Sequence, residues 1–421
     1  MRVDLLIHSA DEVVCLTEAP QRGAALGTLN VVAQGALAVR DGRIVDVGPS
    51  TALRRRHRAS EQIDASGCVL LPGFVDPHTH AMWIGDRALE FEQRIAGRTY
   101  SEILAAGSGI LSTVEHTRAA SVAQLVGATR PRLRRMLAHG TTTCEIKTGY
   151  GLDAGSELRM LEAIARLRRS MPMTIQATFL PAHAVPREYA ARPDAYVDEI
   201  IERMLPRALA RWRELCGEQA PLFVDVFCEK GAFSLAQSRR IFERARALGY
   251  RLKIHADEFE NLGGTALAVE LGAASADHLV ATSKAEIAAL GASATVAVAL
   301  PGTPFGLAQP AYTPARALIE AGATLALASD FNPGTSPCES MQMVIALACR
   351  YMRLTPAEAI AAATINAAAA LGLADRVGSL TPGKEADLIA LEIPSYRHLG
   401  YRYGTNWVKW VMRGGKRVER G

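Results

Sequence analysis

The chain has 421 residues, a formal net charge of +4, 49% hydrophobic residues and 21% charged residues. This composition is typical of a globular protein, and the length predicts one large domain accompanied by a smaller one. The small net charge gives no reason to expect nucleic-acid binding, and no apolar run reaches the ~18 residues that would span a membrane.

The cysteines and the N-terminus indicate the compartment. The chain has seven cysteines, and none of them form a C-x-x-C pair, which favours reduced thiols over a disulfide framework. Asp4 and Asp11 interrupt the apolar N-terminal stretch, and a secretory signal would lack such charges. We therefore expect a cytoplasmic protein.

Both ends of the chain have β patterns. Short strands are expected at residues 5–7, 13–16, 36–40 and 43–47, and near the C-terminus at residues 387–391, 407–413 and 417–418. Asp41-Gly42 is a strong hairpin signal, and Gly414-Gly415 lies where another turn is needed. We predict that residues 1–65 and 380–421 together form one small β-sandwich domain.

The middle of the chain alternates strand and helix patterns. Eight strands are expected at residues 73–80, 141–147, 174–183, 223–229, 252–257, 276–280, 294–300 and 324–330. Helices are expected at residues 156–169, 235–248, 265–271, 312–321, 340–352 and 356–372. This alternation predicts an α/β fold, a (β/α)8 TIM barrel over residues 66–379. An open doubly wound sheet is the alternative, but no G-x-G-x-x-G follows the first strand.

Two histidines lie at the end of the first predicted barrel strand. The apolar run at residues 69–75 predicts a buried parallel strand, and His78 and His80 follow it. Residues two apart on a strand point the same way, so both imidazoles would face one point, as zinc or iron ligands do. Asp76 shares that face and is a candidate hydrogen-bond partner, or else a turn residue before Pro77. An isolated H-x-H pair can also be two unrelated loop residues, so the other strand ends must decide.

Metal-binding residue types follow several other strands, where the catalytic residues of a (β/α)8 barrel lie. They are His183, His255, His278 and Asp330. Together with His78 and His80, five of the ten histidines therefore fall at predicted strand ends. Three imidazoles and a carboxylate make a mononuclear site with an open position for water. We predict that the metal ligands are His78, His80, His255 and Asp330.

Longer segments around these residues resemble a known family. The H-x-H pair and the barrel-plus-β layout are similar to the metal-dependent amidohydrolase superfamily, and six motifs resemble its imidazolonepropionase family. The motifs are residues 72–80 (Pro-Gly-Phe-Val-Asp-Pro-His-Thr-His), 145–152, 181–186, 253–259, 275–279 and 329–334. The resemblance extends from about residue 70 to 385, and Pro181 stands where the family has glycine.

The resemblance implies a hydrolase of histidine degradation that opens the ring of 4-imidazolone-5-propanoate to give N-formimino-L-glutamate. It also implies one zinc or iron per chain and a homodimer. Asp330 would accept a hydrogen bond from the attacking water. Glu258 would shuttle a proton and contact the ring, and His278 would polarise the carbonyl or relay a proton.

The propionate of that substrate needs cationic and hydroxyl donors. Candidate substrate-binding residues are Arg87, Tyr100, Tyr150, His183, Glu258, Asn332, Gly334 and Thr335. Among them, His183 matches the substrate-binding histidine of the family. Arg87 is expected to grip the propionate carboxylate with its guanidinium fork.

Three alternatives follow from the same residues. The chain could be another mononuclear amidohydrolase, or a deaminase that acts on a small nitrogen heterocycle. It could be a non-catalytic scaffold, but scaffolds usually lack one or more ligands. It could hold two metals bridged by a carboxylated lysine, but Lys230 lies beyond the expected position, so one metal is predicted. A small-molecule substrate is expected, with neither nucleic acid nor membrane as a partner.

Overall fold

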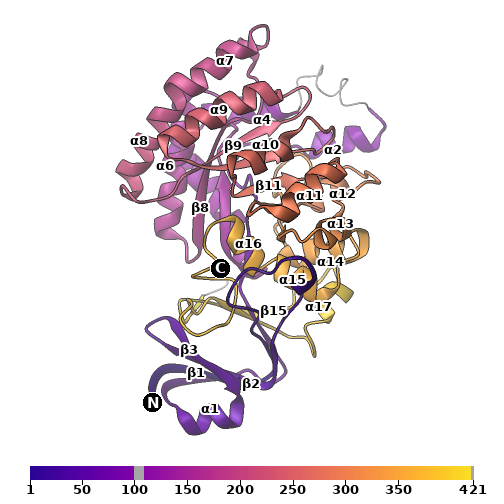
Figure 1. Cartoon of the computed structure of the whole chain (residues 1–421). Coiled ribbons are helices and arrows are strands. Elements are labelled where there is room, and N and C mark those ends of the chain that lie inside the picture. Colours follow the sequence, from indigo (N-terminus) through magenta and orange to yellow (C-terminus); the bar gives the residue numbers. More distant parts are fainter. Residues whose placement is uncertain (99–108, 419–421) are drawn as a thin grey trace.

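The computed structural model describes residues 1–98 and 109–418, and the predicted substrate residue Tyr100 lies outside them. Eight parallel strands follow one another in chain order around a barrel, and helices surround them (Figure 1). The barrel strands are β6 (Phe74–Asp76), β7 (Thr141–Lys147), β8 (Thr174–Ala182), β9 (Phe223–Cys228), β10 (Arg251–Ala256), β11 (Ser275–His278), β12 (Val296–Ala299) and β13 (Leu325–Leu327). The predicted (β/α)8 barrel is confirmed.

The barrel closes through the segments that follow its first and last strands. The Asp330 amide donates to the His78 carbonyl (3.1 Å), and the His80 amide donates to the Phe331 carbonyl (2.9 Å). These bonds bring the H-x-H pair beside the aspartate that follows β13. Closure of the barrel therefore also assembles the predicted metal site.

Helices cover the outside of the barrel. They are α2 (Ala88–Ile95), α4 (Ile110–Ala119), α5 (Val122–Ala138), α6 (Ala154–Ser170), α7 (Pro193–Glu199), α8 (Leu205–Cys216), α9 (Leu235–Leu248), α10 (Gly264–Leu271), α11 (Lys284–Ala292), α12 (Gly302–Gly306), α13 (Ala315–Glu320), α14 (Met341–Tyr351), α15 (Pro356–Ala362), α16 (Ile365–Ala370) and α17 (His398–Tyr401). A π-helical turn, η3 (Ile200–Met204), joins α7 to α8, and two 3-10 turns occur at η1 (Gly23–Ala25) and η2 (Arg187–Tyr189). The predicted helix at residues 356–372 is divided between α15 and α16. No helix in the described ranges is both long and apolar enough to cross a bilayer.

The termini build one mixed sheet at the other end of the molecule, where Figure 1 shows β1–β3 in indigo. Its strands are β1 (Arg2–Val14), β2 (Val31–Arg40), β3 (Arg43–Pro49), β4 (Arg58–Asp64), β5 (Val69–Pro72), β14 (Leu388–Leu391), β15 (Val408–Arg413) and β16 (Lys416–Val418), with the short helix α1 (Ser50–Arg56) against it. Asp41 and Gly42 both have positive φ, as a tight hairpin requires. The domain limits 1–65 with 380–421, and 66–379, stay a prediction.

The apolar run before the H-x-H pair is divided between the two sheets. We predicted one buried strand there, but β5 pairs with β1 and β14 in the terminal sheet, whereas β6 belongs to the barrel. Gly73 lies between them, where an added Cβ would lie 2.1 Å from Thr142 Oγ1. A side chain at this position would clash with Thr142, and Gly73 itself belongs to neither strand.

Candidate metal centre and active site

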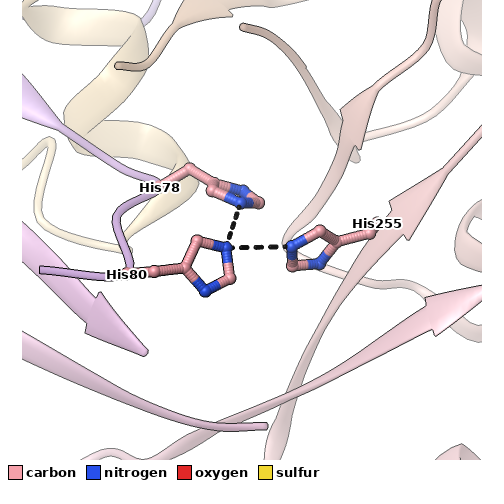
Figure 2. Close-up of side chains that lie close together, drawn as sticks. All are labelled: His78, His80 and His255. Carbon is pink, nitrogen blue, oxygen red and sulfur yellow. Dashed lines mark hydrogen bonds between the residues drawn. The ribbon is translucent and has the colours of Figure 1, made fainter. Parts of the chain in front are cut away.

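Three imidazoles meet at the end of the barrel. The Nε2 atom of His80 lies 3.3 Å from Nε2 of His78 and 3.2 Å from Nε2 of His255. Figure 2 shows the three rings turned toward one another. Strand β6 ends at Asp76, so the H-x-H pair lies just beyond the strand and not on it. Thr79 points away and donates to the Glu145 carbonyl on β7, which turns both histidines toward the centre.

Asp330 completes the group. Its Oδ1 atom lies 3.5 Å from Nε2 of both His78 and His80, and its Oδ2 accepts a hydrogen bond from Thr303. Burial raises the pKa of Asp330 to about 6. Its φ of 52° is unusual for a residue other than glycine, and such strained backbone is concentrated at functional sites.

These donor atoms fit a metal ion. Burial and the charge of Lys147 hold the pKa of His78 well below its usual range, and burial and His183 do the same for His80, so both rings are neutral. The three Nε2 atoms lie 3.2–3.3 Å apart along the two contacts of His80, and one cation can accept the lone pairs of unprotonated Nε2 atoms together. His78, His80 and His255 form one group able to hold a metal, and His78, His278 and Asp330 form another. His278 is thus a further possible ligand beside the predicted four.

Buried carboxylates orient two of these imidazoles from behind. The Nδ1–H of His78 donates to Oδ2 of Asp277 (2.6 Å), and Nδ1 of His255 lies 3.0 Å from Oδ2 of Asp225. A carboxylate at Nδ1 leaves Nε2 free to bind a metal. Asp76, considered for this role, instead accepts hydrogen bonds from the amide and hydroxyl of Ser329. It therefore stabilises the backbone next to Asp330.

Glu258 and His278 lie together on the cavity side of the site. Oε2 of Glu258 lies 3.6 Å from Nε2 of His278, which has no hydrogen-bond partner in the described residues. Burial, and then the charges of Asp330 and Glu229, raise the pKa of Glu258 well above its usual range. A raised pKa favours the protonated carboxyl of Glu258, which is the form that can donate a proton. This is the behaviour expected of the group that would protonate a leaving nitrogen.

The Tyr150 loop is shaped by Glu157 at the start of α6. The Glu157 carboxylate accepts hydrogen bonds from the amides of Gly149, Gly151 and Leu152, and an added Cβ on Gly151 would lie 2.8 Å from the Glu157 amide nitrogen. The tight loop directs the buried Tyr150 side chain toward the cavity. Nothing in the local sequence marked Glu157 for this role, and it was not predicted.

His183 lies between this loop and the three imidazoles. Its ring stacks on His80 with centroids 4.7 Å apart and planes 16° apart, and its Nδ1–H donates to the Gly149 carbonyl (2.9 Å). Burial and the neighbouring His255 lower the pKa of His183 to about 3. A neutral ring with Nδ1 as donor leaves Nε2 as an acceptor for a ligand N–H.

Arg87 lies at the cavity, but its fork already has a partner. Its Nε and Nη2 atoms donate to the two carboxylate oxygens of Glu90 (2.9 and 2.5 Å), and Glu90 also accepts from the Gly109 amide. The guanidinium packs so closely on Gly334 that an added Cβ there would lie 2.3 Å from Nη1. Arg87 thus cannot offer its whole fork to a carboxylate unless Glu90 moves.

The predicted loop after Asp330 is held together by its own side chains. Asn332 Oδ1 accepts from the amides of Gly334 and Thr335 (2.8 Å each), and its amide donates to the Asp330 carbonyl (2.7 Å). Asn332 and Thr335 line the cavity. In this arrangement Asn332 shapes the loop, and the Thr335 hydroxyl accepts from Nδ2 of Asn332 (2.9 Å) and donates to its Oδ1 (3.2 Å).

A cavity of about 860 Å³ opens onto the site. The predicted residues that line it are His80, Arg87, Tyr150, His183, His255, Glu258, His278, Asp330, Asn332 and Thr335. Arg94, Glu229 and Gln309 also line it and were not predicted, because nothing in their local sequence marks them. Lys230 lies at the exposed rim of the cavity, where its Nζ pairs with Oε1 of Glu260 at 2.7 Å. Its position is consistent with the prediction of a single metal.

Comparison with known proteins identifies the family. The amidohydrolase family matches residues 69–418, and a bacterial imidazolonepropionase-like composite domain matches residues 35–59. The imidazolonepropionase of Herpetosiphon aurantiacus is 57% identical over 417 residues, covering 99% of this chain and 97% of the relative. The chain is a member of the imidazolonepropionase family.

Other relatives agree with this membership. The imidazolonepropionase of Chloroflexus aggregans is 51% identical, covering 99% of this chain and 98% of the relative. Among solved structures, a zinc-bound adenosine deaminase from Xanthomonas campestris superposes with a TM-score of 0.74 at 21% identity, covering 99% of this chain and 93% of the deaminase. At that identity the likeness shows the shared fold. The imidazolonepropionase family is therefore indicated by sequence, and the barrel with its terminal β domain by sequence and structure alike.

Proposed function

We propose that this protein hydrolyses 4-imidazolone-5-propanoate to N-formimino-L-glutamate. The observation that carries the proposal is 57% identity over nearly the whole chain to a protein named imidazolonepropionase, combined with a cavity in which the expected ligand and proton-transfer residues converge. A deaminase with this fold need not bind a substrate that carries a side-chain carboxylate, so its pocket needs no cationic group for that purpose. Arg87 at the cavity therefore favours the propionate substrate.

We infer that His78, His80, His255 and Asp330 hold one metal ion per chain, zinc or iron. Imidazole and carboxylate donors suit both metals. When bound, such a metal acidifies water and polarises a carbonyl. Metal analysis of the purified protein distinguishes the two elements, and one equivalent per chain is the expected stoichiometry.

The protein's own side chains supply the remaining chemistry. Asp330 accepts a hydrogen bond from the attacking water. His278 polarises the substrate carbonyl by donating a hydrogen bond to it, or relays a proton there. Protonated Glu258 gives its proton to the ring nitrogen as the C–N bond breaks and the new C–O bond forms. Tyr150 and His183 contact the substrate from the opposite wall, and Arg87 and Thr335 supply donors for the propionate.

The decisive experiment follows the ultraviolet absorbance of freshly generated substrate. The full-length protein should remove the ring absorbance and release N-formimino-L-glutamate, and a chelator should stop the reaction. Glu258→Gln keeps the shape of the side chain without its acid and should lower kcat by about 100- to 10,000-fold. Release of ammonia from a purine or pyrimidine without hydrolysis of the imidazolone would establish the deaminase alternative instead.

We propose a homodimer, as the family resemblance implies. Light scattering coupled to size exclusion tests this directly. A mass near 45.1 kDa, that of one chain, would contradict the homodimer.

A further inference from the structure

Five ionisable side chains are fully buried behind the metal site. This buried charge network consists of Glu145 and Lys147 on β7, Asp225 on β9, Lys253 on β10 and Asp277 on β11. The network thus places two lysine and three acidic side chains together within the barrel. Burying charges is costly, and apolar residues of similar size would often serve stability as well. The network therefore calls for a role other than stability.

Lys147 is the cation that the network shares. Its Nζ lies 2.6 Å from Oδ2 of Asp225, 2.8 Å from Oε2 of Glu145 and 3.9 Å from Oδ2 of Asp277. Burial by itself would lower the pKa of Lys147, but the carboxylates of Asp225 and Glu145 raise it above its usual range. The side chain is therefore an ammonium ion held among three carboxylates.

The two aspartate oxygens near Lys147 are the same atoms that face the metal-site imidazoles. Oδ2 of Asp225 lies 3.0 Å from Nδ1 of His255, and Oδ2 of Asp277 lies 2.6 Å from Nδ1 of His78. Lys147 thus lies within ion-pair distance of both carboxylates that face Nδ1 of His255 and of His78. Such partners of ligating histidines strongly influence metal affinity.

We propose that Lys147 is a positioning residue for the metal centre. It holds Asp225 and Asp277 so that His255 and His78 carry their protons on Nδ1 and present Nε2 to one point. This inference rests on the proposed metal site and is independent of the substrate. A failure of the imidazolone assay would therefore leave it untouched.

Lys253 offers a matched comparison within the same network. It is equally buried, lies 3.1 Å from Oε1 of Glu145 and 3.6 Å from Oδ2 of Asp277, and donates to the Pro77 carbonyl. In the described part of the chain it makes no ion pair with Asp225. Loss of Lys253 should therefore disturb only the Asp277–His78 pair. Loss of Lys147 should disturb both that pair and the Asp225–His255 pair.

The test measures metal binding without substrate. Full-length protein is stripped of metal, and its affinity for Zn²⁺ is measured by competition with a chromogenic chelator. The visible absorption of the Co²⁺-loaded protein reports ligand geometry. The test variants are Lys147→Met, Lys253→Met and Asp225→Asn. Lys384→Met is the control, because Lys384 is also a buried lysine but lies in the segment next to the terminal sheet, where it donates to the Glu18 carbonyl.

Lys147→Met should bind Zn²⁺ about 10- to 100-fold more weakly and change the Co²⁺ spectrum. Lys253→Met should lose less, and Lys384→Met should bind as the unmodified protein does. A folded Lys147→Met with unchanged affinity and spectrum, or an equal loss in Lys253→Met, would overturn the proposal. If Lys147→Met does not fold, Asp225→Asn decides: weaker binding supports the role, and normal binding refutes it. Failure of the unmodified protein to bind Zn²⁺ would refute the metal site itself.

Discussion

Gly151→Ala tests whether the Tyr150 loop positions the substrate. An added Cβ would lie 2.8 Å from both the amide nitrogen and Oε1 of Glu157. Ordinary contact begins near 3.5 Å, so the loop must move by about 0.7 Å. The same change threatens the 2.7 Å hydrogen bond from the Gly151 amide to Glu157.

Two effects should follow from this displacement. Overpacking of a buried site costs about 1–3 kcal/mol, so the free energy of unfolding should fall by that amount. A displacement approaching 1 Å near a reacting group can cost about 100-fold in rate, so kcat/KM should fall by 10- to 100-fold. Denaturant unfolding and steady-state kinetics on the imidazolone measure the two effects separately.

Gly155 provides the control four residues away. It lies in the first turn of α6, where an added Cβ would meet Asp153 Oδ1 at 3.4 Å and Arg159 Nη1 at 3.7 Å, which are ordinary contacts. Gly155→Ala should therefore leave the kinetics unchanged and stabilise the protein by about 0.4–1 kcal/mol. Normal stability and kcat/KM in Gly151→Ala would refute the reasoning.

Three further predictions concern charge and metal. Burial and nearby carboxylates raise the pKa of Glu258. Glu229→Gln removes one of these negative charges, so the pKa of Glu258 should fall. The loss of kcat/KM at high pH should then begin at a lower pH. An unmoved pH profile would contradict the acid role of Glu258. Arg87→Ala should raise KM about 10- to 100-fold through loss of charge-assisted hydrogen bonds, with no such change for a ring analogue lacking the propionate. Metal removal should lower stability by about 2.7 kcal/mol relative to protein in Zn²⁺ at 100 times its Kd, and unchanged thermal unfolding after chelation would argue against a metal that binds the folded state.

The order of strands, helices and turns could be predicted because the sequence signals for them are local. Apolar runs of strand length alternate with helical periodicity, and the turn at Asp41-Gly42 needs residues that tolerate positive φ. The position of β7 (Thr141–Lys147) and the extent of α9 (Leu235–Leu248) match the expected residues. At residues 69–76 we expected one strand, and the structure has two strands in different sheets. An apolar run does not reveal that it is divided at Gly73.

The candidate ligands were also predictable, because the chemistry of a parallel barrel lies where its strands end. His78, His80, His255 and Asp330 needed only their residue types and this rule. Their supporting groups have no comparable local signal. A further clue was nevertheless present: charged residues such as Glu145 and Lys147 inside buried strands must find partners, because an unpaired buried charge is costly.

The sequence alone therefore determined the barrel, the strand ends and the residue types available for metal and proton chemistry. Only the tertiary structure decided which groups meet: His78 with Asp277, 199 residues away, and Lys147 with Asp225, 78 residues away. The reason is physical. Periodicity and turn chemistry act over a few residues, whereas hydrogen bonds between side chains require distances near 3 Å that only the register and closure of the barrel establish.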